Sequence, residues 1–275
     1  MDTNLLKIFI VVADKESITL AANELGFTQS NVTLRIKQLE KNLKCSLFHR
    51  IPKGVVLTDE GKRLYKHSIQ IVRKVEDAIL DVQNEQEQKK LIIGSTDCNA
   101  VVRISSFITK LHEDYPNIQL EFLTGTTKEI TKMVLEYKVN VAFISGEPIH
   151  NELIVLKRYD EELAILEEKN NKSQNVLLTF KEGSIFDDFL RKYYEKNGIE
   201  VEKSIAFGSL ETILACVKAG MGKTLLPLKL VDKLGYKEEL KVTKLDKKVA
   251  YFPTCMICRK DYLPKISEYL KEMVF

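Results

Sequence analysis

The chain has 275 residues, of which 44% are apolar and 29% are charged. This length favours two or three domains, and the composition indicates a soluble, folded protein rather than a disordered one. No run of 18 apolar residues occurs, so no membrane-spanning helix is predicted. The first residues lack the basic stretch of a signal peptide, and the five cysteines are scattered, so we expect a cytoplasmic protein without disulfides.

The excess positive charge is concentrated at the N-terminal end. The formal net charge is +3, and residues 1–58 alone carry 8 Lys or Arg against 5 Asp or Glu. Acidic and basic residues balance over 59–90 and again over 91–275. A local basic surface attracts phosphates even in a protein that is nearly neutral overall.

Three short helices are expected first. Residues 4–13 form one amphipathic helix, and a second follows from a Ser17 cap to about Leu25. Thr28 then caps a third helix over 29–43. This arrangement resembles a helix-turn-helix, in which the last helix faces DNA.

The third helix has two distinct faces. Its apolar face is predicted to be buried and consists of Val32, Ile36, Leu39 and Leu43. The opposite face is polar and basic and includes Gln29, Ser30, Thr33, Leu34, Lys37 and Lys41. Amide and hydroxyl groups read base edges in a major groove, and lysines meet phosphates, so this helix is a candidate recognition helix.

A hairpin is predicted directly after this helix, with Pro52, Lys53 and Gly54 between two short strands. Such a hairpin is a wing, from which Arg50 and Lys53 reach the DNA backbone or the minor groove. The expected DNA contacts are therefore Gln29, Ser30, Asn31, Thr33, Leu34, Lys37, Arg50 and Lys53. The alternative is an ordinary solvated polar face.

A long helix is predicted from Thr58, with Asp59 and Glu60 favourably placed in its first turn. A heptad-like apolar row, in which Ser68 fills one gap, consists of Leu64, Ile71, Val75, Ala78 and Val82. This row predicts pairing with a second copy of the chain. Residues 84–90 are polar and are interpreted as a hinge.

From Leu91 onward, short apolar strands alternate with helices. This pattern predicts an α/β fold with mostly parallel sheets. The expected strands are 91–94, 118–122, 139–144, 176–179, 204–207 and 224–226, and the expected helices are 99–114, 128–137, 185–197 and 210–219.

The N-terminal residues form a string that resembles the LysR-type transcriptional regulators. The string consists of Ser17-x-Thr19-x-Ala21-Ala22, Gln29-Ser30-x-Val32-Thr33-x-x-Ile36, Leu39-Glu40-x-x-Leu43, Leu47-Phe48-x-Arg50, Val56-x-Thr58 and Gly61. The rest of the chain matches less densely, at Tyr115-Pro116, Val139 to Phe143, Val217 to Gly222 and Leu225 to Pro227.

The resemblance implies a three-part organisation. Residues 1–58 would be a winged helix-turn-helix, 59–90 a linker helix and hinge, and 91–275 an effector domain similar to periplasmic binding proteins. Its first lobe would comprise about 91–158 and 248–275, and its second about 159–247. The family further implies binding to double-stranded DNA and assembly into homodimers and homotetramers.

Loops at the carboxyl ends of the strands are where an α/β domain binds ligands. The candidate effector-binding residues are Thr96, Asp97, Cys98, Asn99, Thr126, Ser145, Ser184 and Ser209. Hydroxyls and helix N-termini favour a small polar, anionic metabolite. The alternative is that these Ser and Thr residues are ordinary helix caps.

Three residues depart from the family pattern. Lys44 stands where the family usually has Gly, so the turn at Lys44-Cys45 is expected to differ, because a non-Gly residue in the left-handed conformation costs about 1–2 kcal/mol. Asn140 replaces the usual Asp. Lys223 replaces an aliphatic residue and is expected to reach solvent, with pairing to an acid in the cleft as the alternative.

No catalytic or metal-binding pattern is evident. Cys255-x-x-Cys258 lies in an apparent strand, where the two side chains point to opposite faces, and a Cys98–Cys216 redox pair has no support in the sequence. The four histidines have no ligand spacing, so no metal, cofactor or enzymatic activity is expected. Two other hypotheses for the function stay open: a constitutive DNA-binding protein whose α/β half only oligomerises, and a binding protein or enzyme on the same two-lobed fold.

Overall fold

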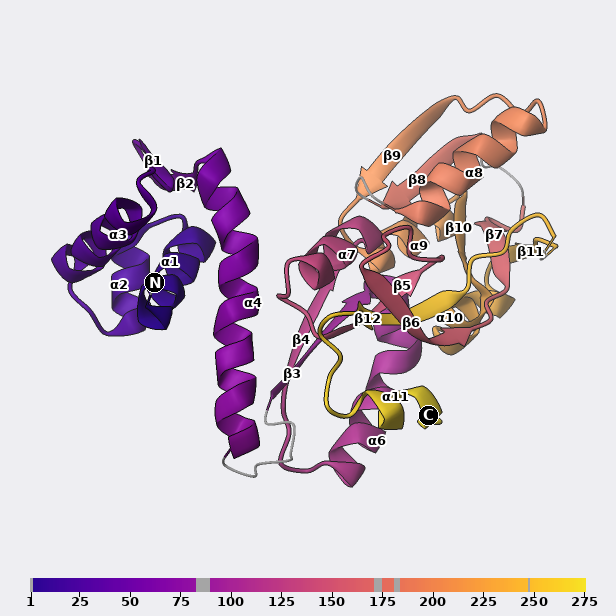
Figure 1. Cartoon of the computed structure of the whole chain (residues 1–275). Coiled ribbons are helices and arrows are strands. Elements are labelled where there is room, and N and C mark those ends of the chain that lie inside the picture. Colours follow the sequence, from indigo (N-terminus) through magenta and orange to yellow (C-terminus); the bar gives the residue numbers. More distant parts are fainter. Residues whose placement is uncertain (1, 83–89, 171–174, 181–183, 247) are drawn as a thin grey trace. The chain divides into compact units, whose positions relative to one another are not determined.

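The computed structural model describes two compact units (Figure 1), Met1–Gln86 and Glu87–Phe275. The described residues are 2–82, 90–170, 175–180, 184–246 and 248–275. Most of the hinge expected at 84–90 lies outside them. Each unit is described by itself.

The first unit contains the three expected short helices, α1 (Thr3–Lys15), α2 (Ile18–Leu25) and α3 (Gln29–Leu43). Each begins where a side-chain oxygen accepts a hydrogen bond from a backbone N–H of the first turn. The capping residues are Asp2, Ser17 and Thr28. Phe9 and Val12 of α1 and Val32 and Leu39 of α3 are almost fully buried and form the centre of this unit.

The turn after α3 keeps the left-handed geometry that glycine would favour, although the residue is Lys44. Lys44 has φ of 55°, and its N–H lies 3.3 Å from the Lys41 carbonyl, while the Cys45 N–H reaches the Glu40 carbonyl at 3.2 Å. The expectation that this turn would differ is therefore wrong. The two hydrogen bonds hold the turn in place, and the conformational cost is carried by Lys44.

The wing consists of β1 (Phe48–Ile51) and β2 (Gly54–Leu57), which pair antiparallel around Pro52 and Lys53. Gly54 has φ of 145°, and a Cβ at this position would overlap the Glu16 carbonyl oxygen. The same carbonyl accepts the Val55 N–H at 2.8 Å. The wing is thus attached to the turn between α1 and α2, and only glycine fits at the point of contact.

The long helix α4 (Asp59–Val82) begins at Thr58, whose hydroxyl accepts the Gly61 N–H and donates to the Ser46 carbonyl. Its buried side, which packs on α1, includes Tyr65, Ile69 and Val72. Ser68 is fully buried and donates to the Leu64 carbonyl, so it does not fill a gap in an outward row as expected.

The outward row of α4 is apolar. Ile71, Val75, Ile79 and Val82 are 36%, 38%, 50% and 84% exposed, and Ala78 is exposed as well. Leu64, the first residue of the predicted row, is half-buried and thus less exposed than the others. Ile79 extends the row that the sequence predicted.

The first lobe of the second unit is built on a five-stranded sheet with the order β4-β3-β5-β12-β6. Its strands are β3 (Lys90–Thr96), β4 (Gln119–Gly125), β5 (Val141–Ser145), β6 (Leu153–Tyr159) and β12 (Thr254–Arg259). The helices of this lobe are α5 (Asp97–Asn99), the π-helical segment Ala100–Ile104, α6 (Ser105–Asp114), α7 (Thr127–Leu135) and α11 (Ser267–Glu272).

The second lobe contains a three-stranded sheet, β10-β7-β11, and the pair β8-β9, which a parallel bridge between Leu177 and Lys223 links to β10. Its elements are β7 (Leu163–Glu167), β8 (Val176–Phe180), α8 (Ile185–Lys196), β9 (Lys203–Phe207), α9 (Leu210–Lys218), β10 (Thr224–Pro227), α10 (Leu228–Lys233), the 3₁₀ turn Tyr236–Glu238 and β11 (Lys241–Lys244). Figure 1 shows β8, β9 and α8 on one side of this unit and β3, β4 and α6 on the other.

The expectation of mostly parallel sheets is wrong, because four of the seven strand pairings described for this unit are antiparallel. β3 pairs parallel with β4 and β5, and β8 pairs parallel with β9. The antiparallel pairs are β5–β12, β6–β12, β7–β10 and β7–β11. Each of these pairs includes β7 or β12, the strands that follow the two places where the chain crosses between the lobes. A chain that crosses and returns brings in strands that run in the opposite direction.

The strained turn at Lys44 leads to a stability prediction. Lys44→Gly should stabilise residues 1–82 by about 1 kcal/mol, because glycine adopts a positive φ without steric cost. Urea titration of this fragment, followed by circular dichroism, measures the change. Lys41→Gly is the matched control: Lys41 is exposed inside α3, so the same substitution there should destabilise by about 1 kcal/mol. Equal effects at both positions would contradict the argument.

Candidate functional site

The first candidate site is the exposed face of α3. Gln29, Ser30, Asn31, Leu34 and Lys37 are exposed, and Thr33 is half-buried. A shallow hollow on this face is lined by Gln29, Ser30, Thr33, Leu34 and Lys37, which are five of the six helix residues expected to contact DNA. The sixth, Asn31, lies outside the hollow and accepts a hydrogen bond from Arg35. Arg35 was not among the residues predicted to contact DNA.

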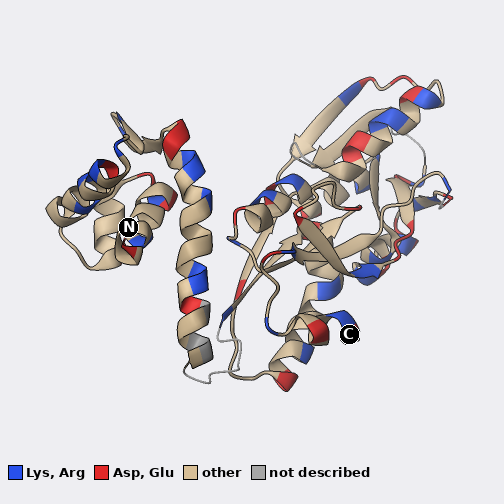
Figure 2. Ribbon diagram, viewed as in Figure 1, with Lys and Arg blue, Asp and Glu red and all other residues tan. Residues whose placement is uncertain are grey.

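The wing adds two exposed cations to this surface. Arg50 lies on β1, and Lys53 lies in the two-residue turn between the strands. Figure 2 shows that Lys or Arg residues occur on both α3 and the hairpin. The unit thus presents amides, hydroxyls and cations on a helix and a hairpin that are fixed to each other through α1 and α2.

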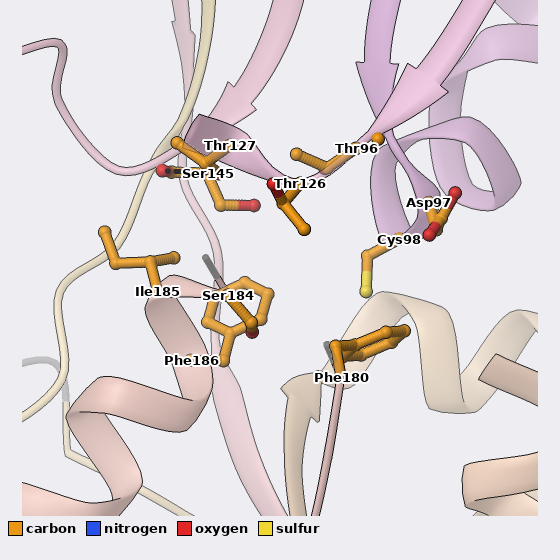
Figure 3. A pocket seen from close by; sticks show the side chains of 11 residues that line it. Thr96, Asp97, Cys98, Thr126, Thr127, Ser145, Phe180, Ser184, Ile185 and Phe186 are labelled. Atoms are coloured by element: carbon orange, nitrogen blue, oxygen red, sulfur yellow. Dashed lines mark hydrogen bonds between the residues drawn. The ribbon is translucent and has the colours of Figure 1, made fainter. Parts of the chain in front are cut away.

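The second candidate site is a cavity of about 40 Å³ in the second unit (Figure 3). One side is formed where β3, β4 and β5 end, and the other by the end of β8 and the start of α8. Its lining consists of Thr96, Asp97, Cys98, Gly125, Thr126, Thr127, Ser145, Phe180, Ser184, Ile185 and Phe186. This volume holds no more than a few waters.

Six of the eight expected effector residues line this cavity: Thr96, Asp97, Cys98, Thr126, Ser145 and Ser184. Ser209 caps α9 and donates to Glu211 at 2.6 Å, outside the lining. Asn99 is buried behind the wall, where its Nδ2 donates to the Thr96 hydroxyl at 2.9 Å. The structure therefore brings most of the residues expected to bind the effector to one cavity.

The residues that sequence reasoning missed are chiefly apolar. Gly125 and Thr127 flank Thr126 and follow from the same strand-end rule. Phe180, Ile185 and Phe186 had no signal in the sequence, because only the docking of the second lobe brings them to the cavity. Figure 3 shows the Cys98 sulfur pointing toward Phe180.

The hydroxyls of the cavity are engaged to different degrees. Thr126 forms a complete capping box with Glu129, so its side chain serves chiefly as a helix cap. Thr96 and Ser184 also precede helices, but neither makes a side-chain cap hydrogen bond. Backbone N–H groups at such helix starts are suited to anionic oxygens.

Carboxyl groups lie in and beside the described lining of the cavity. Burial raises the pKa of Asp187 to about 6, although the Phe180 N–H donates to this carboxylate at 2.7 Å and opposes the shift. Burial, reinforced by the nearby carboxylates of Asp97, Asp187 and Glu161, raises the pKa of the Cys98 thiol far above its usual value. Cys98 is therefore a protonated, apolar wall residue and a poor nucleophile.

A buried polar cluster lies behind the cavity wall and joins both crossing segments of the chain. The Arg103 guanidinium pairs with the Glu161 carboxylate and donates to Asn99 Oδ1 at 3.0 Å. The Thr254 hydroxyl lies 2.8 Å from Asn99 Oδ1 and 2.9 Å from Glu161 Oε1. We call these four residues, Asn99, Arg103, Glu161 and Thr254, the junction cluster.

Lys223 and Asn140, which depart from the family pattern, have structural roles. Lys223 does not reach solvent as expected: its side chain is 16% exposed and pairs with Glu167 at 3.1 Å, outside the cavity lining. Burial alone would raise the pKa of Glu167, but Lys241 and Lys223 hold it below its usual value. Asn140 Oδ1 accepts the Ile92 N–H at 2.7 Å, a contact that an Asp carboxylate would also make.

Cys255 and Cys258 lie on β12 and pack into two different cores, on opposite faces of the sheet, as expected. Burial raises their pKa values to about 12 and about 11. All five cysteines are free thiols.

Among the described residues, no cluster of His, Cys, Asp or Glu could hold a metal ion. None of the described helices has the length and apolar character needed to cross a bilayer.

Two family models together match nearly the whole chain. Residues 3–62 match the bacterial regulatory helix-turn-helix protein of the lysR family, and residues 84–274 match the LysR substrate binding domain. The transcriptional regulator GltR of Bacillus subtilis is 32% identical over 99% of this chain and 96% of its own length. The regulator CzcR of Bacillus thuringiensis (strain Al Hakam) is 35% identical over 95% and 89%.

Two solved structures share the fold. A full-length OxyR variant from Pseudomonas aeruginosa has a TM-score of 0.79 at 19% identity and covers 98% of this chain and 93% of its own. Full-length CbnR in complex with its target DNA has a TM-score of 0.65 at 18% identity, with coverage of 99% and 98%. Helix-turn-helix, long helix and two-lobed α/β unit thus occur together in other proteins in the same order.

Proposed function

The chain belongs to the LysR family of bacterial transcriptional regulators, and from this premise we propose that a small metabolite bound between the two lobes controls how it acts on DNA. The protein is a DNA-binding transcription regulator with an effector-binding domain. The observation that carries the proposal is the cavity between the ends of β3, β4 and β5 and the start of α8. A ligand there touches both lobes and can favour one lobe arrangement over another.

The lining favours a small, polar effector with one acidic group. Thr96 and Ser184 precede helices whose first N–H groups can bind an anionic oxygen. No Lys or Arg belongs to the described lining, and the nearby Asp187 disfavours a highly charged anion. Phe180 and Phe186 add a short apolar surface, so a small carboxylic acid suits the cavity better than a phosphate ester.

DNA is bound, on this proposal, through the recognition helix and the wing. Gln29, Ser30 and Thr33 face base edges, with Leu34 beside them, and Lys37, Arg50 and Lys53 meet phosphates. The exposure of these residues and the shared hollow on α3 support the assignment. Because the DNA partner is the bacterial chromosome, the protein acts in the cytoplasm.

The apolar row of α4 supports assembly into a homodimer. Ile71, Val75, Ile79 and Val82 are exposed, and pairing with a second copy would bury them. A two-fold dimer places two recognition helices on a two-fold-related DNA site. A homotetramer, formed from two such dimers, is the further assembly we propose.

The DNA assignment gives two different expectations for two variants. Gln29→Ala should cost about 1–3 kcal/mol at a specific site and relax sequence preference, because an amide that reads a base edge is lost. Lys53→Ala should weaken binding to all sequences and lower the salt slope by about one unit. Titrations at several salt concentrations measure both. Unchanged binding in both variants would exclude this surface.

The dimer assignment is tested on α4. Val75→Glu should convert the dimer to monomers and weaken DNA binding strongly, because it puts a charge into the apolar seam. Light scattering at micromolar concentration measures the assembly. Lys74→Glu, which adds an acid at the neighbouring exposed position, should leave the dimer intact. A monomeric wild-type protein would exclude the seam.

The effector cavity is tested with a panel of small carboxylic acids. A binder at 100 times its Kd should stabilise the protein by about 2.7 kcal/mol, which a thermal-shift assay detects. Thr96→Val and Ser184→Ala, one from each lobe, should weaken this response, whereas Ser209→Ala should not, because Ser209 lies outside the lining. If the two cavity variants respond like wild type, the cavity is misassigned. If no acid binds, the alternative of a constitutive DNA-binding protein whose α/β half only oligomerises is favoured.

A further inference from the structure

Arg35 lies on α3 next to the recognition surface and holds Asn31 in one orientation. Its Nε donates to Asn31 Oδ1 at 2.8 Å. Its guanidinium carbon lies 5.6 Å from the centre of the Phe27 ring, within the range of a cation–π interaction. Asn31 is exposed and Phe27 is 41% exposed, so this group of three side chains is at the surface.

The hydrogen bond changes what Asn31 can recognise. A free asparagine reads adenine in the major groove with two hydrogen bonds, one accepted by its oxygen and one donated by its NH₂ group. Arg Nε is only a donor, so the amide atom that it meets must be the oxygen. This bond takes one of the two lone pairs of the oxygen and fixes the orientation of the amide, so the Asn31 NH₂ donors are held in a defined direction.

Arg35 adds further donors in a fixed plane. The Nη groups of a guanidinium are donors only, and they form a fork that matches two acceptors side by side. The hydrogen bond to Asn31 and the Phe27 ring restrict the side chain before DNA arrives, so less rotational freedom is lost on binding. Asn31 and Arg35 together thus present a preorganised surface on which donors outnumber acceptors.

We propose that Arg35 is a DNA-contacting residue and that the Asn31–Arg35 pair binds a group that only accepts hydrogen bonds. Two parts of DNA have this chemistry: the O6/N7 edge of guanine and the phosphate oxygens. Adenine, which a lone asparagine at position 31 would read, suits the pair less well, because its N6 needs an acceptor and one lone pair of the Asn31 oxygen is already taken. The proposal rests on DNA binding and extends it beyond the face of α3 that carries Gln29, Thr33 and Lys37.

The test selects binding sites for the full-length protein from a pool of random-sequence duplex DNA, in parallel for wild type, Arg35→Ala and Asn31→Ala. If the pair reads guanine, Arg35→Ala loses a guanine at one position of each half-site. It gains adenine there, because the Asn31 amide is then free to turn both its oxygen and its NH₂ group toward the base. Affinity for the wild-type site should then fall about tenfold to a hundredfold.

If the pair binds a phosphate, the selected sequence stays the same. Affinity then falls for every sequence, and the salt slope decreases by about one unit. Arg35→Lys separates the two sources further. It keeps the charge but loses the fork, so it should retain phosphate binding and lose the guanine preference.

Lys196→Ala is the matched control, since it removes one positive charge from an exposed position in the other unit and should change neither sequence nor slope. Thermal unfolding verifies that each variant is folded. An Arg35→Ala protein with wild-type selected sequence, affinity and salt slope overturns the proposal. If the wild-type protein selects no sequence, specific DNA recognition and the guanine contact are both contradicted. The salt slopes of wild type and Arg35→Ala on an unselected duplex then still test the phosphate contact.

Discussion

The junction cluster is the constraint on which the effector domain depends. Arg103 and Glu161 are both almost fully buried, and a buried charge is tolerated only when it is paired and hydrogen-bonded. Removing either partner of such a pair typically costs about 3–5 kcal/mol. Glu161 belongs to the segment that leaves the first lobe, and Thr254 to the strand that re-enters it. The cluster therefore fixes both crossing points of the chain with one set of contacts.

The same cluster reaches the cavity. Asn99 lies between Arg103 and Thr96, so the wall of the cavity and the crossing segments share a continuous chain of hydrogen bonds. Arg103 sits in a π-helical segment, a form that is rare in proteins and occurs often at functional sites. Glu161 Oε2 has no hydrogen-bond partner among the described residues. A change at Thr96 thus has a short physical route to the place where the lobes are joined.

The DNA-binding half could be predicted from the sequence almost completely, because its signals are local. Ser17, Gly26 and Thr28 mark helix ends by hydrogen bonds within a few residues, and the apolar stripe of α3 follows from periodicity alone. The cavity could be predicted only on one side. Ser184 and Ser209 both precede helices, but only contacts between distant segments bring Ser184 to the cavity and leave Ser209 outside it. The Glu167 partner of Lys223 was hidden for the same reason, since the two residues are far apart in the sequence.

The attachment of the wing fixes its position relative to α3, the proposed recognition helix. Val55 and Gly54 are held against the Glu16 carbonyl, and the base of the hairpin is tied by the Thr58 N–H to the Leu47 carbonyl at 2.9 Å. Only Pro52 and Lys53 project beyond these fixed points. The distance between the wing tip and α3 is consequently fixed by the fold of the protein. If the wing and α3 contact DNA as proposed, a half-site of a different groove width has to deform to fit. Sequences whose backbone adopts the matching width without strain are then favoured, even at positions where no side chain touches a base.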